Sequence, residues 1–218
     1  MCLKHAVRVR EKAFFNENDR QLLQGCNFDE SVAAKYCSSV DFECMNHVFH
    51  GIAIRNLHNG LEFFDNNQFA TPKTVGVAGL VVIVNTLARQ KRSCVVFMDF
   101  KDLLAYLTLR KNYPSDEIKK IPKKIDYVVL NEISNWQFLF ERIKEYDNVY
   151  CLLPNTELGG ILVKTMQSIH EGKTIDYSQF YADCKSLTDY LQLQKGRLEI
   201  RIHVNMEIHI SVNTLLYI

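Results

Sequence analysis

The sequence lacks the features that mark secreted, membrane-spanning or strongly basic proteins. Its seven cysteines form no Cys-x-x-Cys pair, and residues 1–20 carry too many charges for a secretory signal peptide. The most apolar run, residues 75–87, is too short to cross a bilayer. A formal net charge of only +1 argues against nucleic-acid binding through overall charge. We therefore expect a cytoplasmic protein with reduced thiols, no membrane contact, and nucleic-acid binding confined to local basic patches.

What is present is the pattern of an α/β protein. The 218 residues are 47% hydrophobic and 23% charged, enough for one large or two small domains. The short continuous apolar run at 94–98 is typical of a strand covered on both faces, residues 125–130 and 149–153 are predicted as further strands, and each precedes a segment of helical periodicity. A shorter unit of the same kind covers residues 174–193. The alternation predicts a mostly parallel sheet flanked by helices, with ligands binding beyond the carboxyl ends of its strands.

The N-terminal part has a different pattern. Residues 1–46 are predicted to be largely helical, with Asn27 and Glu30 capping a short helix. Alternating apolar residues on both sides of Asn59-Gly60 predict a hairpin with a two-residue turn, because both central residues can take positive φ. Farther along the chain, Ser134 and Gln137 are predicted to form a capping box.

The C-terminal part shows strict period two. Every even position from Leu198 to Val212 is apolar, and every odd one is Arg, Glu, His, Asn or Ser. This predicts one long strand, or a hairpin folded near Asn205, that completes a sheet of its own chain or pairs with a second copy. We therefore divide the chain into an N-terminal α+β region (1–80), a parallel-sheet domain (81–195) and a C-terminal β segment (196–218).

The order of these elements resembles a known family. An Asn-Gly hairpin, then Asn66, Pro72 and Lys73, then strand–helix repeats, is similar to Toprim-domain proteins related to bacterial DNA primases, most of all short primase-like proteins of mobile elements. The similarity runs from about Leu22 to Leu191 and is carried by KYCSSVDF, VVFMDFKDLLAYLTL, DYVVLN and YADCKSLTDYL. It implies a Toprim-like sheet domain and, in active relatives, primase-type nucleotidyl transfer with Mg²⁺.

The motifs that the family needs for this chemistry are degenerate here. The family has a Glu, a Gly and an Asp after the first strand and an Asp-x-Asp after a later one. This chain places Met98, Asp99 and Asp102 at the first motif, and Pro154 and Thr156 at the two Asp positions. A thioether cannot transfer a proton, and Pro and Thr supply no carboxylate for a hard metal ion. The resemblance therefore implies a chain without family catalysis, metal or cofactor.

Two interpretations of the remaining carboxylates stay open. Asp99, Asp102 and Glu157 could rebuild a metal site from shifted positions. Alternatively, Asp99 caps the helix after the first strand, and Glu157 favours the start of a later helix, both at positive helix ends.

Other candidate groups are less specific. The basic residues that could line a nucleic-acid path are Arg55, Lys73, Arg89, Lys91 and Arg92. Phe63, Phe64 and Phe69 could stack on bases or form the hairpin core. Cys44, His47 and His50 have a spacing that could hold a metal, but a fourth ligand is missing.

Three functions follow, in decreasing order of support. The first is a DNA-binding module, for single-stranded DNA, connected with replication or mobilisation of a mobile element. The alternative is a protein-interaction or structural module, such as a homodimer formed through the C-terminal strand. The third is an active Toprim primase or nuclease with a shifted metal site.

Overall fold

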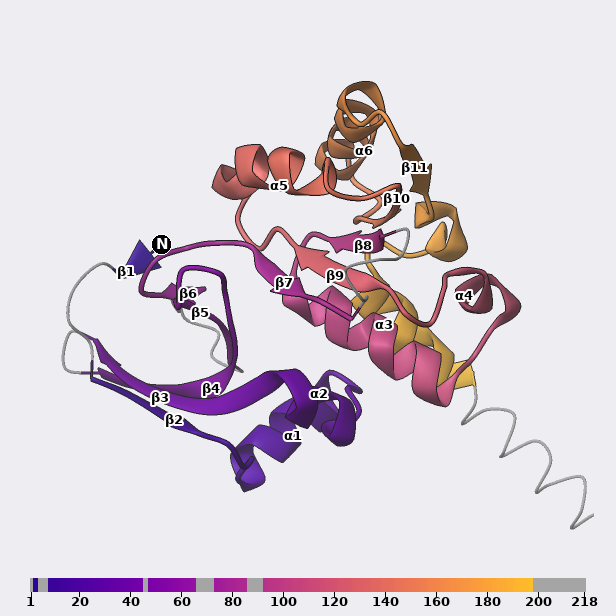
Figure 1. Cartoon of the computed structure of the whole chain (residues 1–218). Coiled ribbons are helices and arrows are strands. Elements are labelled where there is room, and N and C mark those ends of the chain that lie inside the picture. The colour runs from indigo at the N-terminus through magenta and orange to yellow at the C-terminus, as the bar shows by residue number, and fades with distance from the viewer. Residues whose placement is uncertain (1, 4–7, 45–46, 66–72, 86–91, 198–218) are drawn as a thin grey trace, which may run out of the picture.

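The computed structural model describes residues 2–3, 8–44, 47–65, 73–85 and 92–197, which form two β-sheets with helices packed on them (Figure 1). The first sheet has the strand order β1-β6-β5-β4-β3-β2 and is antiparallel except for β1 with β6. Its strands are β1 (Cys2–Leu3), β2 (Val9–Lys12), β3 (Cys37–Cys44), β4 (His47–Arg55), β5 (Leu61–Phe64) and β6 (Thr74–Val75). Two helices, α1 (Glu17–Gly25) and α2 (Glu30–Tyr36), connect β2 to β3.

The second sheet has the order β11-β10-β8-β9-β7, and only β7 is antiparallel to its neighbour. Its strands are β7 (Val81–Ile83), β8 (Ser93–Phe97), β9 (Asp126–Val129), β10 (Asn148–Leu152) and β11 (Lys173–Asp176). The helices are α3 (Phe100–Asn112), α4 (Asp116–Lys120), α5 (Trp136–Ile143), α6 (Glu157–Ile169) and a last helix over residues 187–197, with short 3-10 turns η1 (Ile133–Asn135) and η2 (Ser178–Tyr181).

Helices cover both faces of this second sheet. The side chains of β8 alternate between two cores: Cys94 and Val96 pack with α5 and α6, whereas Val95 and Phe97 pack with α3. Figure 1 shows α5 and α6 on one side of the sheet and α3 on the other. The predicted α/β class, with strands covered on both faces, is therefore confirmed.

The core next to α3 also extends into the first sheet. Phe100, in the first turn of α3, packs on Phe64 of β5 with ring centroids 5.4 Å apart, and Phe64 in turn contacts Phe28. Phe63 points the other way, onto Phe42. Phe63 and Phe64 are both buried, so their interpretation as hairpin core is confirmed, whereas Phe69 lies outside the described residues.

The largely helical prediction for residues 1–46 was wrong over β2 and β3. In β3, Val40 and Phe42 alternate with more polar residues and are buried on one face, and the strand pairs with β4 over its whole length. That alternation is a period of two, which helical periodicity cannot produce. The α2 cap is Asp29, whose side chain accepts from the Val32 N–H, while Asn27 takes a positive φ of 58° before it.

The hairpin between β4 and β5 is confirmed, but its two-residue turn was wrong. Residues 56–60 connect the strands, and of Asn59 and Gly60 only Asn59 has a positive φ. The Asn56 side chain shapes the turn: its Oδ1 accepts from the N–H groups of His58 and Gly60, both at 2.9 Å. Gly60 is required for packing, since a Cβ there would lie 2.0 Å from the Val77 carbonyl oxygen.

The predicted capping box of Ser134 and Gln137 was wrong, because Ser134 lies inside η1 and α5 begins at Trp136 without a side-chain cap.

The period-two segment 198–212 lies outside the described residues. Within the described ranges, no helix has the length and apolarity needed to cross a bilayer.

Candidate functional site

The turns after β8 and β9 are joined at the carboxyl edge of the second sheet. The Asn131 N–H donates to the Met98 carbonyl oxygen at 2.8 Å, and the Leu130 N–H donates to Phe97 at 3.0 Å. Met98 is half-buried and packs against the core under α5 and α6. The residue at the first motif position therefore presents a thioether, which offers neither a proton nor a hard metal ligand.

Asp99 is the N-cap of α3. Its side chain accepts from the Lys101 N–H at 2.6 Å, and its backbone is extended, with φ −139° and ψ 147°. The Lys101 ammonium lies 3.9 Å from the same carboxylate. The interpretation of Asp99 as a helix cap is thus confirmed.

Asp102 points into the protein. Its side chain is in the core, with the residue only 4% exposed, and Oδ1 accepts from the N–H and the hydroxyl of Thr188 at 3.1 and 3.0 Å. Burial, reinforced by the charge of Asp99 and opposed by the Thr188 bonds, raises the pKa of Asp102 to about 7. This carboxyl therefore holds the first turn of the 187–197 helix onto α3.

The turn after β10 is organised around the start of α6. Thr156 caps the helix by accepting from the Gly159 N–H at 3.2 Å. The Asn155 amide donates to the carbonyls of Tyr181 and Cys184 at 3.0 and 2.8 Å. Gly159 is needed here, since a Cβ would lie 2.1 Å from the Pro154 carbonyl oxygen. Glu157 is exposed in the first turn of α6.

A hollow of about 220 Å³ opens over this turn. It is lined by residues 153–156 and 159–160 together with Val163, Asp176 and Ser178. In the part of the chain that the structure describes, no three His, Cys, Asp or Glu side chains are grouped as metal ligands. Asp99, Asp102 and Glu157 are thus not brought together as the shifted metal site requires.

The Cys44, His47 and His50 candidate is also separated. Cys44 and His47 are opposite each other at the end of the β3–β4 pair. His50 instead lies between two carboxylates, with Nε2 3.0 Å from Asp19 and Nδ1 2.5 Å from Asp41. The His50 ring thus connects α1 to the first sheet.

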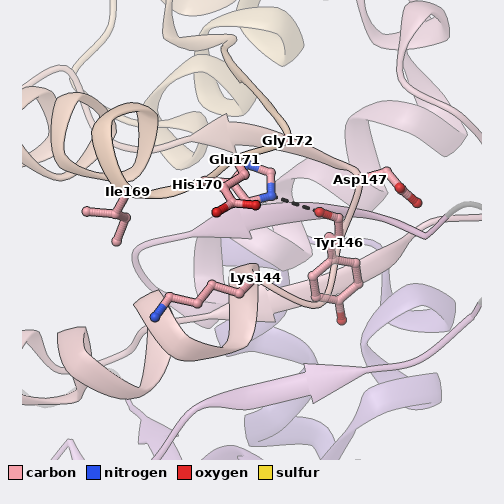
Figure 2. A pocket seen from close by; sticks show the side chains of 7 residues that line it. All are labelled: Lys144, Tyr146, Asp147, Ile169, His170, Glu171 and Gly172. Atoms are coloured by element: carbon pink, nitrogen blue, oxygen red, sulfur yellow. Dashed lines mark hydrogen bonds between the residues drawn. The ribbon is translucent and has the colours of Figure 1, made fainter.

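A second hollow, of about 640 Å³, lies at the opposite, amino edge of the second sheet (Figure 2). Its lining residues are Lys144, Tyr146, Asp147, Ile169, His170, Glu171 and Gly172. The His170 ring is buried and bonds through Nε2 to the Tyr146 carbonyl at 2.7 Å and through Nδ1 to the Thr174 hydroxyl at 2.9 Å. The two ring nitrogens thus hold the loops after α5 and α6 together. Because both are engaged in these hydrogen bonds, neither is available to bind a ligand.

The candidate basic residues do not form one line. The Arg55 guanidinium pairs with Glu11 and donates to the Asn59 carbonyl at 3.2 Å. Lys73 is exposed beside β5, where its carbonyl accepts from Phe63. Arg89 and Lys91 lie outside the described residues.

Arg92 lies at the amino end of β8, six positions and thus about 20 Å from Met98 at the other end of the strand. Its guanidinium pairs with the fully buried Asp126 at 3.0 Å and with Glu145 at 3.3 Å, and covers the Tyr146 ring. The prediction that Arg92 lines a path to Met98 does not agree with this position. The sequence around Arg92 does not indicate this ion pair, because Asp126 lies 34 positions away in the chain.

We expect Arg92→Ala to lower the free energy of unfolding by about 2–3 kcal/mol, because the buried Asp126 carboxylate loses its guanidinium partner. Urea denaturation measures this loss. Lys144→Ala is the control: it removes an exposed pair with Glu141 and should cost at most about 0.5 kcal/mol. An Arg92→Ala protein of full stability would restore Arg92 as a candidate ligand contact.

Sequence reasoning missed a polar group between the two sheets. Glu62 of β5 is 2% exposed and accepts from Asn56 Nδ2 at 2.7 Å and from the Thr74 hydroxyl at 2.8 Å. The same hydroxyl lies 3.0 Å from Glu132, two residues after Leu130. A carboxylate inside the apolar run Leu61–Phe64 was the available signal.

Exposed apolar side chains at the start of α5 were also missed. Ile133, Trp136 and Phe138 are all exposed, Trp136 and Phe138 by 42% and 57%. Phe138 meets the His58 ring of the β4–β5 turn with centroids 6.1 Å apart. Aromatic side chains on a helix surface are typical of sites that bind a partner.

No family model matches this chain, and no curated protein matches it. Solved structures do match. The primase fragment of the bacteriophage T7 primase-helicase protein superposes with a TM-score of 0.52 at 16% identity, covering 90% of this chain and 75% of that one. A second match comes from a structure of the bacteriophage T7 lagging-strand DNA polymerase interacting with primase domains bound to an RNA/DNA hybrid and dTTP. One chain of that structure superposes with a TM-score of 0.51 at 13% identity, covering 88% of this chain and 90% of that one.

The primase of Aquifex aeolicus, in its zinc-binding and RNA polymerase domains, gives a TM-score of 0.50 at 11% identity. The match covers 89% of this chain and 57% of that one, so this chain spans little more than half of the Aquifex protein structure. Likeness at these identities concerns the fold. The chain has a primase-like fold.

Proposed function

We propose that this protein is a Toprim-type nucleic-acid-binding module without catalytic carboxylates, acting in the replication or mobilisation of a mobile element. The observation that carries the proposal is the carboxyl edge of the second sheet. Met98 and Pro154 occupy the motif positions, Thr156 is a helix cap, and Asp102 is buried against Thr188. A groove of this fold that has lost its metal ligands can still bind a phosphate backbone through Lys and Arg, because such binding needs only positive charge.

The division into a primase-like region (1–80), a Toprim-like domain (81–195) and a C-terminal segment (196–218) belongs to the same proposal. It is supported by the chain path, since β6 at Thr74–Val75 belongs to the first sheet and β7 at Val81–Ile83 to the second. The nucleic acid would cross the junction of the two sheets, with Arg55, Lys73, Arg89 and Lys91 as its contacts. Arg92 is left out because its guanidinium supports the fold.

Single-stranded DNA should bind weakly, and its affinity should fall steeply with salt, because each phosphate contact releases counterions. Replacing Lys73, Arg89 and Lys91 together by Ala should reduce the slope of log K against log salt by about 2, at ~0.7 per contact. Fluorescence anisotropy of a labelled oligonucleotide at several salt concentrations measures the slope.

The matched control replaces Lys119, Lys120 and Lys144 by Ala. These lysines are exposed, and each pairs with an acidic residue three positions earlier. Both triple variants remove three positive charges, so the net charge of the protein changes equally. The proposal fails if no binding is detected at low salt, or if the control triple flattens the slope as much as the test triple. Mg²⁺-dependent primer synthesis by the purified protein would favour the third function, an active enzyme.

The exposed aromatic side chains of α5 support a second candidate, a protein-interaction module. Trp136 and Phe138 are more exposed than most aromatic side chains of a folded domain. One form of this candidate is a homodimer through the period-two C-terminal segment. A monomer in sedimentation at micromolar concentration would eliminate the homodimer, and a dimer without DNA affinity would favour it over the nucleic-acid proposal.

A further inference from the structure

The Thr74 hydroxyl lies between the carboxyl groups of Glu62 and Glu132. Its two contacts need one more proton than the hydroxyl and two ionised carboxylates supply. Thr74 Oγ1 lies 2.8 Å from Glu62 Oε2 and 3.0 Å from Glu132 Oε1. A hydroxyl has a single proton, so it can donate to only one of these oxygens. With both carboxylates ionised, the other contact would place two acceptors against each other at hydrogen-bond distance.

One protonated carboxyl resolves this conflict. If Glu132 holds the proton, it donates to Thr74, and Thr74 donates to Glu62. If Glu62 holds it, the two bonds reverse while the oxygens keep their positions. We propose that Glu62 and Glu132 share one proton through the Thr74 hydroxyl, and that this proton fastens the two sheets to each other.

The surroundings of Glu62 favour a neutral pair. Burial raises the pKa of Glu62; the bonds from Asn56, Thr74 and Gly79 oppose this rise, and the charge of Glu132 adds to it. The His58 ring lies against Gly79, whose N–H donates to Glu62 at 3.4 Å. Glu132 is half-buried, and its second oxygen faces the Ser134 hydroxyl at 3.4 Å. One carboxyl is therefore enclosed, while the other can reach solvent.

The position of the pair gives the proton a consequence. Glu62 and Thr74 belong to β5 and β6 of the first sheet, whereas Glu132 directly follows Asn131, whose N–H bonds to Met98. When the proton leaves, the two carboxylates repel each other across Thr74. Glu132 then turns to solvent, and the turn after β9 loses its hydrogen bond to Thr74 of the first sheet. This contact is thus closed at low pH and open at high pH, while the aromatic contacts of Phe100 with Phe64 and of Phe138 with His58 remain.

The test is carboxyl titration by ¹³C NMR of glutamate-labelled full-length protein. We expect Glu62 to titrate above the ordinary range of a glutamate carboxyl, because burial and the charge of Glu132 raise its pKa. In Glu132→Gln the amide can donate to Thr74 permanently and carries no charge, so the pKa of Glu62 should be lower than in the wild type. Thr74→Ser should keep the wild-type titration, and Thr74→Val should abolish the coupling.

A second readout follows the junction itself. The opening free energy of the Asn131 amide, from hydrogen exchange corrected for intrinsic pH dependence, should fall as the proton leaves in the wild type and should stay constant in Glu132→Gln. Glu141→Gln, which removes an exposed carboxylate paired with Lys144, is the control and should behave as the wild type. Titration of Glu62 in the ordinary glutamate range, or an unchanged pKa of Glu62 in Glu132→Gln, would overturn the proposal.

Discussion

Alanine at Gly159 should destabilise the protein by about 3 kcal/mol, whereas alanine at the adjacent Gly160 should stabilise it by ~0.5–1 kcal/mol. The two glycines are consecutive residues in the first turns of α6. A Cβ on Gly159 would lie 2.1 Å from the Pro154 carbonyl oxygen, which is backbone and cannot turn away. A Cβ on Gly160 would meet no atom within 4 Å, so the substitution only removes glycine's backbone freedom in the unfolded chain.

Urea denaturation of the two variants measures both signs in one experiment. Because the residues are neighbours in one helix, helix propensity favours alanine at both positions, and only the contact with Pro154 distinguishes them. Equal stabilisation by the two substitutions would show that the turn after β10 does not press against α6. In that case the close approach of Gly159 to the Pro154 carbonyl oxygen would not be part of the candidate site.

The protein should lose roughly 2–4 kcal/mol of stability between pH 4 and pH 8 through Asp102 alone. Its pKa is about 7 in the folded protein and 3.8 in an ordinary aspartate. In that interval the folded state keeps a proton that the unfolded state releases, so the free energy of unfolding falls as the pH rises. The contribution is complete below the unfolded pKa and is lost above pH 7.

Asp102→Asn should remove this dependence of the free energy of unfolding on pH. The variant should also be more stable than the wild type at pH 8. The amide oxygen can still accept the bonds that Thr188 now donates to Oδ1, so the 187–197 helix keeps its cap. Asp116→Asn is the control, since Asp116 is exposed and its pair with Lys119 contributes little. An unchanged slope in Asp102→Asn would show that Asp102 ionises in the native protein at its ordinary pKa.

Local signals predicted the second sheet well. The strands β8, β9 and β10 are mostly apolar, and the Asp99 cap lies directly before the helix it serves, so both can be seen in a short window of sequence. In β3, by contrast, Val40 and Phe42 are separated by a polar residue, and the strand follows the two helices α1 and α2. The period of two was present there but covers few residues, and the helical periodicity before it obscured it.

The contacts that sequence reasoning missed join residues that are far apart in the chain. Arg92 is held by Asp126, 34 positions away, and Thr74 reaches Glu132 over 58 positions. Asp102 bonds to Thr188 across 86 positions. A spacing rule can suggest that an aspartate belongs to a motif, but only the folded chain shows that its carboxyl is turned into the core. The motif alone therefore could not distinguish a ligand from a buried cap.

The 187–197 helix has a consequence for synthesis on the ribosome. Its Lys195 ammonium and Gln192 amide donate to Asn27 and to the Gly25 carbonyl at 2.8 and 3.2 Å, contacts that span more than 160 positions. The turn between α1 and α2 emerges early, yet its partners emerge after most of the chain. Contacts of such sequence separation slow folding. The nascent turn between α1 and α2 therefore lacks these partners until Gln192 and Lys195 have left the exit tunnel.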